Sequence, residues 1–379
     1  MSTAAHAATP TEAESPAQVV AAEYIQTSPV WLSKIKGPEY IAKGYPYEED
    51  IKAGPLPKSG FKFNLKAYPE TNKQPPVNHP EVQAVIKQLD FTKVGTAIPR
   101  TVKDWVLDIT HYNALEDPDC WWSASICKKP KIAFIPEDIY VCPNKGDWGL
   151  NYDDGPYKFG YPTTEKDKEF DQPRFYNFLV DSANKQKATL FFVGSNLVKF
   201  PIAAQRALHD GHTICSHTWS HPQMTSLTNE EVVAQLYWTQ KAIKESLGIT
   251  PKCWRPPYGD VDDRVRSIAW QMGMRTILWD QDSNDWNLQH ENSNATIMIS
   301  EKWLPQLQKS FNVMPIHQCI NEPHPYWEES WVYPTLDSPD PPHYPRPKKH
   351  LNTLFHSESI RQIQLYNNNP RNTYVPNNA

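Results

Sequence analysis

An alternation of strand and helix signals along residues 148–279 limits the fold of this chain more than any other feature. Residues 188–193 read Ala-Thr-Leu-Phe-Phe-Val, an apolar and β-prone run that Gly194 ends. The strongest helix signal covers Thr228 to Leu247, where Thr228 and Glu231 form a capping box. Further signals alternate with these: strands at 148–152, 213–216 and 274–279, and helices at 173–184, 201–210 and after Asp262. This order predicts an α/β fold in which helices connect parallel strands.

Two short segments beside these strands carry metal-binding chemistry. Asp153 and Asp154 are adjacent in the run Tyr-Asp-Asp-Gly-Pro, and His217 and His221 flank Thr-Trp-Ser. One carboxylate and two imidazoles can hold a divalent metal and leave positions open for water and substrate. The second carboxylate is then available as a general base. The sequence therefore predicts a metal-dependent hydrolase.

Two later segments add to this set. Arg255 precedes two prolines, which suggests a fixed guanidinium paired with a carboxylate, and residues 282–286 bring Asp282 and Trp286 together. All four segments follow predicted strand ends, as expected at the C-terminal face of a β/α barrel. An iron-dependent oxygenase would also use one Asp and two His as ligands. The second carboxylate and the Arg255 segment favour the hydrolase.

Composition limits the partners and the compartment. The net charge is -5 at pH 7, which gives no electrostatic reason to expect a nucleic acid as partner. No stretch is long and apolar enough for a transmembrane segment. Residues 1–20 contain no secretory h-region, so no signal peptide is visible in this chain.

The six cysteines do not form a Cys-x-x-Cys pair, which argues against a structural zinc knuckle. Cys120 and Cys127 are close in a loop, and Cys142 precedes the first strand that carries chemistry. These cysteines are disulfide candidates in an oxidising compartment. We expect Cys215 and Cys253 to be buried free thiols.

Three regions are predicted along the chain. Residues 1–125 mix polar and proline-rich stretches with short apolar patches, so we expect a partly ordered N-terminal extension. Residues 126–336 contain the strand and helix alternation and form the main domain. Residues 337–379 are rich in Pro and then Asn, and we expect a disordered tail.

In these motifs the chain resembles the polysaccharide deacetylases with a NodB homology domain (carbohydrate esterase family 4), and among them the fungal chitin deacetylases of the mucoralean type. The resemblance covers roughly residues 117–336 and includes three segments: 120–122, 148–156 and 216–224. It implies a distorted (β/α) barrel that acts as a monomer on chitin or N-acetylglucosamine oligomers. It also implies an extracellular or cell-wall location and a hydrolase that releases acetate and leaves chitosan.

The resemblance also implies a role for each residue of the proposed centre. Asp153 matches the general base of the family. Asp154, His217 and His221 match the metal ligands, usually of zinc, with cobalt or another divalent ion as alternatives. Arg255 matches the residue that orients the base.

Other roles follow from the same resemblance. Tyr258 matches the residue whose backbone N–H stabilises an oxyanion, and with Trp286 it lines the substrate groove. Asp282 matches the carboxylate that tunes a catalytic acid histidine. The disulfide pairs that the family suggests are Cys142 with Cys319 and Cys120 with Cys127.

The chain departs from the family at the acid histidine, which lies in a Leu-x-His motif on a late strand. His290 in Leu-Gln-His-Glu matches this motif better than His317 in Met-Pro-Ile-His, and the order of the downstream segments also favours His290. Only three residues then separate His290 from Trp286. By comparison roughly thirty residues, about one βα unit, are missing. A deletion, a splice variant and a faulty gene model are alternative origins.

This shortening changes the expectations for fold and activity. We expect a barrel that lacks one late βα unit, with an intact metal triad and a disturbed acid position. A second hypothesis follows, in which the chain is a catalytically impaired homologue that binds chitin or the cell wall.

Overall fold

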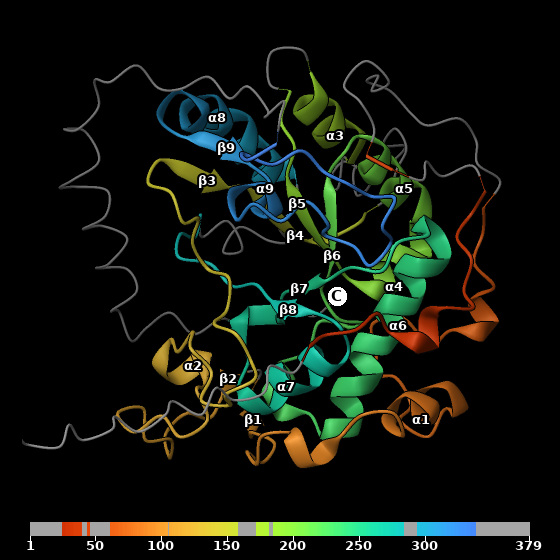
Figure 1. Cartoon of the computed structure of the whole chain (residues 1–379), viewed down its shortest axis with the longest axis vertical. Coiled ribbons are helices and arrows are strands. Elements are labelled where there is room, and N and C mark those ends of the chain that lie inside the picture. The colour runs from red at the N-terminus through yellow and green to blue at the C-terminus, as the bar shows by residue number, and fades with distance from the viewer. Residues whose placement is uncertain are drawn as a thin grey trace, which may run out of the picture.

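Five parallel strands form the central sheet, in the order β4-β5-β6-β7-β8 (Figure 1). They are β4 (Asn151–Gly155), β5 (Thr189–Phe192), β6 (Thr213–Ser216), β7 (Cys253–Trp254) and β8 (Arg275–Thr276). The computed structural model describes residues 25–39, 44–45, 61–104, 106–157, 172–181, 185–283 and 294–338, except for the side chains of residues 172, 173 and 294–296. Every pair of neighbours in this sheet is parallel, which confirms the predicted α/β class.

A second pair of parallel strands adjoins the β4 edge of this sheet. It consists of β3 (Asp147–Gly149) and β9 (Asn312–Met314). Between β3 and β4, the Leu150 N–H donates to the Met314 carbonyl (2.8 Å), and the Leu150 carbonyl accepts from Thr189 N–H (2.9 Å). The predicted single strand at 148–152 is therefore two strands, because the chain changes its hydrogen-bonding partner at Leu150.

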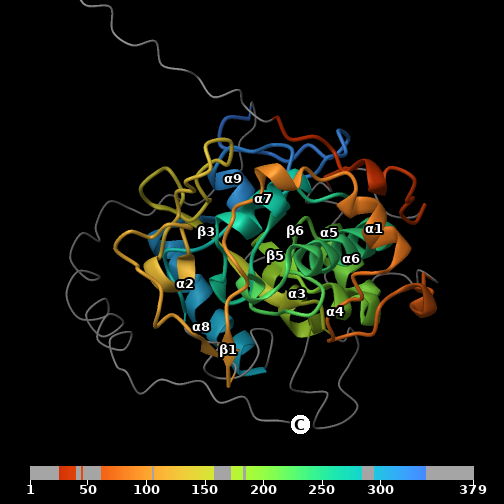
Figure 2. The same ribbon diagram turned by 90° about the horizontal axis from the view of Figure 1, so that it is seen from below.

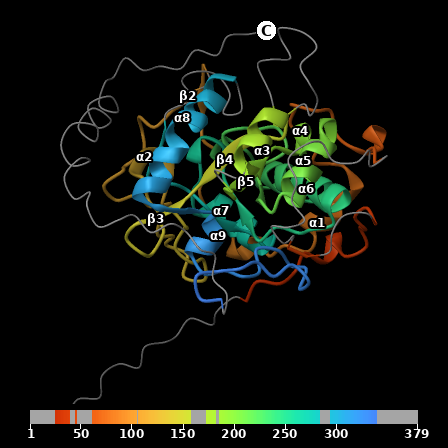
Figure 3. The same ribbon diagram turned by 90° about the horizontal axis from the view of Figure 1, so that it is seen from above.

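Helices cover the strands on two sides. These are α3 (Gln172–Val180), α4 (Gly194–Lys199), α5 (Pro201–His209), α6 (Asn229–Leu247), α7 (Asp263–Gln271), α8 (Asn294–Ser310) and α9 (Ile316–Cys319). Figure 3 shows α8 on one side of β4 and β5, and α3 to α6 on the other. No helix in the described residues is long and apolar enough to cross a bilayer.

Helix α6 shows how local sequence signals fix an element. The Thr228 side chain accepts from Glu231 N–H, and the Glu231 carboxylate accepts from Thr228 N–H. Gly248 ends the helix in the left-handed conformation (φ 73°), which Gly adopts without steric cost. The weaker signal at 274–279 gives only the two residues of β8, followed by a single bridge from Ile277 to Ile139.

The described part of residues 1–125 packs into the same core as the central sheet. Its elements are η1 (Val30–Leu32), η3 (Leu65–Ala67), α1 (Pro80–Ile86), η4 (Phe91–Lys93), β1 (Val102–Lys103), β2 (Val106–Leu107) and α2 (Trp122–Ser125). Val82 and Val85 of α1 are fully buried, and α1 lies along α6 (Figure 2). This segment therefore contributes side chains to the main hydrophobic core.

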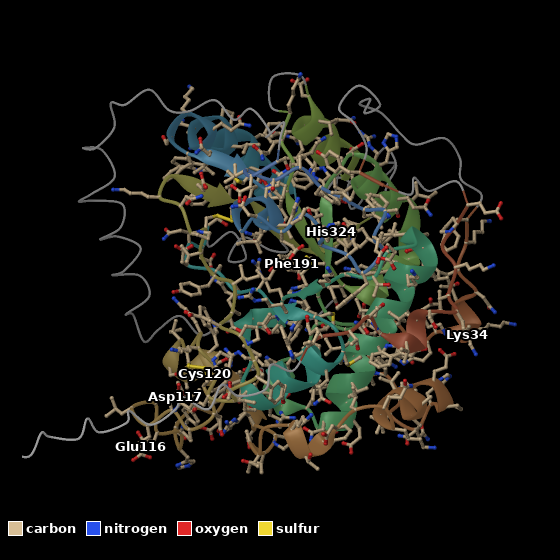
Figure 4. All side chains as sticks on the ribbon, viewed as in Figure 1. Lys34, Glu116, Asp117, Cys120, Phe191 and His324 are labelled. Carbon is tan, nitrogen blue, oxygen red and sulfur yellow. A yellow bond between two sulfur atoms is a disulfide. The ribbon has the colours of Figure 1, made fainter. Side chains whose placement is uncertain are left out.

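A small apolar cluster lies among the central strands, apart from the main core. It contains Phe191, Cys215, Cys253, Ile277 and Ile316. Phe191 lies near the middle of the molecule in Figure 4. The cluster packs directly beneath the strand ends that carry the predicted site.

The expectation that Cys215 and Cys253 are free thiols is wrong, because the two form a disulfide. The parallel register of β6 and β7 aligns Ser216 with Trp254, so the preceding cysteines are opposite each other with Cα atoms 5.2 Å apart. This separation is within the range that a disulfide requires. Sequence spacing could not reveal the pair, since it depends on the register of two strands 38 residues apart.

The other four cysteines form the two pairs that the family resemblance implies. Cys120 bonds Cys127 across the short helix α2, and Cys142 bonds Cys319 across 177 residues. The second bond ties the segment before β3 to α9.

Candidate metal centre

Asp153 and Asp154 lie in β4 at the edge where the central strands end. Asp154 has a left-handed backbone (φ 64°), and its carbonyl accepts a hydrogen bond from Asn196 Nδ2 (2.8 Å). A non-glycine residue in this conformation needs support from its surroundings. The turn therefore directs two consecutive carboxylates toward one region.

The second ligand segment is the loop 217–221, which follows β6. Thr218 and His221 also have positive φ values, 67° and 59°. The His221 N–H donates to Thr218 Oγ1 (3.2 Å), which closes the loop on itself. The rings of His217 and His221 lie edge to face, with centroids 4.9 Å apart.

Three potential ligand atoms converge between these two segments. Asp154 Oδ1 lies 3.1 Å from His221 Nε2 and 3.6 Å from His217 Nε2. The His217 Nδ1 lies 2.8 Å from the Arg255 carbonyl, which can only accept, so Nδ1 carries the proton and Nε2 presents its lone pair. Metal-bound histidines are oriented in this way. A carboxylate and two imidazoles therefore fit zinc or a similar divalent ion.

One other group of potential ligands occurs among the described residues: Asp117, Cys120 and Cys127. Its two cysteines are joined in a disulfide, so they offer no thiolate. Asp154, His217 and His221 are therefore the better candidate for a metal.

The charges of this group are strongly coupled. Burial alone would raise the pKa of Asp154, but the His221 and His217 imidazoles outweigh burial and hold this pKa well below its usual value. Burial would lower the pKa of His217, but the carboxylates of Asp153 and Asp154 outweigh it and raise this pKa. The carboxylates and imidazoles therefore stabilise each other's charged forms.

Asp153 is held by a guanidinium whose donors are nearly all engaged. Arg255 Nη1 donates to Asp153 Oδ1 (2.8 Å) and to Asn151 Oδ1 (2.5 Å), while Nη2 and Nε donate to the carbonyls of residues 278 and 277. Arg255 is only 3% exposed. The other carboxylate oxygen of Asp153 lies 3.9 Å from His217 Nε2. Arg255 thus fixes one oxygen of Asp153 and directs the other toward the ligand group.

Aromatic side chains form a rim beside this group. Tyr258, in the short helix η7 (Pro257–Gly259), has a left-handed backbone (φ 58°), and its ring lies 4.7 Å from the His221 ring. The Tyr258 side chain is 54% exposed. Gly259 packs so closely on Trp122 that an added Cβ would lie 2.5 Å from the indole nitrogen. Trp122 in turn contacts Trp279, with ring centroids 5.8 Å apart.

Three other predicted residues lie in the sequence after β8. Asp282 lies on an exposed loop beyond β8. Trp286 and His290 lie outside the described residues, so their roles stay predictions.

His317 lies at the opposite end of β6 from the ligand group. Its Nδ1 is 2.5 Å from Oγ1 of Thr213, the first residue of β6, whereas His217 follows the last. Four residues of extended chain separate these positions by about 13 Å. Burial lowers the pKa of His317 to about 3, so the imidazole is neutral near pH 7.

Sequence reasoning missed several residues that build the centre. Asn151 contacts Arg255, and Asn196 holds the Asp154 backbone. Gln235 of α6 binds two backbone N–H groups of the 217–221 loop. Asn151 could have been inferred from its place beside the two carboxylates. Asn196 and Gln235 lie in helices far from the carboxylates in the sequence, so nothing in the sequence indicates their contacts with the site.

Comparisons with known proteins agree with the motifs. A family model described as polysaccharide deacetylase matches residues 140–277. A chitin deacetylase of Amylomyces rouxii is 38% identical in an alignment that covers 71% of this chain and 70% of that protein. Chitin deacetylase 2 of Cryptococcus neoformans is 36% identical over 69% of this chain and 63% of its own length.

Among solved structures, the chitin deacetylase of the fungal pathogen Colletotrichum lindemuthianum matches with a TM-score of 0.40 and 22% identity. That match covers 49% of this chain and 92% of the other. The family relationship of this chain depends on the sequence matches.

Proposed function

Because this chain belongs to the polysaccharide deacetylase family, we propose that it hydrolyses the N-acetyl groups of chitin and produces chitosan and acetate. The chitin substrate is supported by the Amylomyces and Cryptococcus relatives, which are named chitin deacetylases. The proposed fold is the distorted barrel of this family without one late βα unit. The proposed substrates are chitin and N-acetylglucosamine oligomers.

Asp154, His217 and His221 would hold a divalent metal, with zinc as the first choice and cobalt as an alternative. When bound, such an ion polarises the acetamide carbonyl and lowers the pKa of water. The Nδ1–H donation from His217 to the Arg255 carbonyl keeps His217 Nε2 aimed at this position.

Asp153 acts as the general base in this proposal. It accepts a proton from water as the water oxygen adds to the amide carbon, and Arg255 keeps the carboxylate oriented during this step. The Tyr258 backbone N–H donates to the oxygen on which negative charge develops. His290, tuned by Asp282, protonates the nitrogen as the C–N bond breaks, and Trp286 lines the groove.

One observation carries the proposal: an immobilised Asp153–Arg255 pair lies beside a convergent ligand set. The test is acetate release from N-acetylglucosamine oligomers in the presence of zinc or cobalt. Asp153→Asn should lower kcat about 100- to 10,000-fold, the usual contribution of general acid–base catalysis. Equal acetate release by the variant and the wild type would contradict the mechanism.

A second candidate is a homologue that binds chitin and does not turn it over. This candidate is favoured by the place where the described five-stranded sheet ends. Its last strand is β8, and the segment between Trp286 and His290, which is shorter than in the family, follows soon after β8 in the sequence. Binding of chitin oligomers without acetate release would support this candidate, and robust turnover would exclude it.

We also propose an extracellular or cell-wall location. Three disulfides in one chain support an oxidising compartment, because cytosolic thiols are kept reduced. A monomer is the proposed assembly.

A further inference from the structure

The backbone of the loop 217–221 adopts a conformation that needs contacts with the rest of the protein. Thr218 and His221 both have positive φ values, although neither is glycine. Such residues persist where contacts with the rest of the protein over-determine their conformation. The contacts that hold this loop therefore set the separation of His217 and His221.

One set of contacts comes from the start of α4. The Gly194 N–H donates to the Thr218 carbonyl (2.9 Å). The Ser195 N–H and hydroxyl both donate to the Trp219 carbonyl, at 3.0 and 2.5 Å. These bonds satisfy the carbonyls of Thr218 and Trp219, while the N–H groups of Trp219 and Ser220 bind another partner.

That partner is Gln235, a fully buried residue in the middle of α6. Its Oε1 accepts from the Trp219 N–H and from the Ser220 N–H, both at 2.9 Å. Its Nε2 donates to Ser220 Oγ (2.7 Å) and to Gln74 Oε1 (2.8 Å). Both lone pairs and both hydrogens of the amide are therefore used.

The N-terminal segment completes this support. Gln74 is exposed, and its Oε1 accepts from Gln235 Nε2 and fixes which way the Gln235 amide points. The backbone of residue 70 accepts from Trp219 Nε1 (3.2 Å), and the Asn72 N–H donates to Ser195 Oγ (3.0 Å). The loop is thus clamped between α4, α6 and residues 70–74, a segment before the match to the family model.

We propose that Gln235 is a positioning residue for the metal centre, oriented by Gln74. It contacts neither His217 nor His221 by any bond described above, and acts by fixing the two peptide N–H groups between them. The proposal rests on the proposed metal function of these histidines. An apolar side chain at this position would leave two buried N–H groups unpaired, so the loop would rearrange to satisfy them.

The test is cobalt titration of the metal-free protein, followed by the visible absorption of the bound ion. Gln235→Leu should bind cobalt about 10- to 100-fold more weakly, as is usual when a group that orients metal ligands is lost. Gln240→Leu is the matched control, since Gln240 is a fully buried glutamine of the same helix that donates to the Met272 carbonyl (2.8 Å). It should bind cobalt as the wild type does. Wild-type affinity in folded Gln235→Leu would overturn the proposal.

A surface variant keeps the test decisive if Gln235→Leu does not fold. Gln74→Ala removes the partner of the Gln235 amide at an exposed position, and we expect several-fold weaker cobalt binding with an unchanged melting temperature. Unchanged cobalt affinity in this variant would then overturn the proposal.

A further arm separates this inference from the proposed function. Wild-type protein that binds no cobalt, or binds it equally after His217→Ala, contradicts the metal centre itself. Wild-type binding that depends on His217 but not on Gln235 contradicts only the inference.

Discussion

At the scale of single residues, the two adjacent carboxylates differ in what surrounds them. Asp154 faces two imidazoles, whereas Asp153 accepts a hydrogen bond from a buried guanidinium. In the proposed mechanism these two identical side chains therefore have different roles, one as a metal ligand and the other as the general base. Their order in the chain was readable from the sequence, and Asn151 as a second partner of Arg255 could have been inferred from its place beside them.

The variant Arg255→Lys tests whether the guanidinium of Arg255 orients the Asp153 carboxylate. Lysine keeps the charge but cannot donate to Asp153, Asn151 and two carbonyls at once, so Asp153 gains freedom. We expect kcat for acetate release to fall about 100-fold, the scale of a misplaced catalytic group. Cobalt affinity should not change, because His217 contacts the backbone of this residue. An unchanged kcat would contradict the role of the guanidinium.

His317 predicts a specific dependence of stability on pH. Its pKa of about 3 in the folded protein is below the unfolded value near 6.5, so the unfolded chain binds more protons as the pH falls below 6.5. The contribution is fully present above pH 6.5 and is lost toward pH 3. Between pH 6.5 and 5 the loss is roughly 2 kcal/mol.

The comparison protein is His317→Gln, measured by urea unfolding across this pH range. Between pH 6.5 and 5, the free energy of unfolding should fall by roughly 2 kcal/mol more in the wild type than in the variant. Parallel curves for the two proteins would show that His317 is not the buried neutral group described above. The buried His212 has a lowered pKa too, so only the difference between the two proteins is informative.

At the scale of elements, local signals were enough for α6 but not for the short strands. The capping box and Gly248 define both ends of α6 without tertiary contacts. The β8 strand has two residues because pairing with β7 covers no more, and pairing is not visible in one sequence. The same reason hid the Cys215–Cys253 bond, since it depends on register.

This disulfide should stabilise the two strands that lead to His217 and Arg255. It closes a loop of 38 residues, for which removal typically costs about 2–4 kcal/mol. We therefore expect the double variant Cys215→Ala/Cys253→Ala to lose stability of this size in denaturant unfolding. The pair Cys120→Ala/Cys127→Ala is the control and should lose less, because its loop spans 7 residues. Equal losses would contradict the loop argument.

At the scale of the whole molecule, the N-terminal segment and the main domain share one core. Phe63, Tyr68, Val82 and Val85 belong to the same apolar cluster as the helices of the central sheet. Tyr68 stacks on Trp219 of the loop 217–221, with ring centroids 5.9 Å apart. Patchy hydrophobicity in residues 1–125 indicated partial order, but a sequence without clear period could not show which surface the segment covers.

Removal of residues 1–99 should therefore prevent stable folding. Each of the large apolar side chains lost contributes about 1.5–3 kcal/mol, and together they approach the total stability of an ordinary domain. We expect the shortened chain to be poorly soluble and to bind no cobalt. A soluble, cobalt-binding protein of residues 100–379 would show that this segment is dispensable.

We propose that Asp153, Asp154, His217 and His221 form the centre of a metal-dependent deacetylase. Acetate release tests this proposal most directly. The wild type is stripped of metal, given chitin oligomers, and assayed before and after zinc is added back. The account predicts no acetate before zinc, release after it, and little release from Asp153→Asn under the same conditions. Acetate that appears without metal, or oligomer binding with zinc but no acetate, would contradict it.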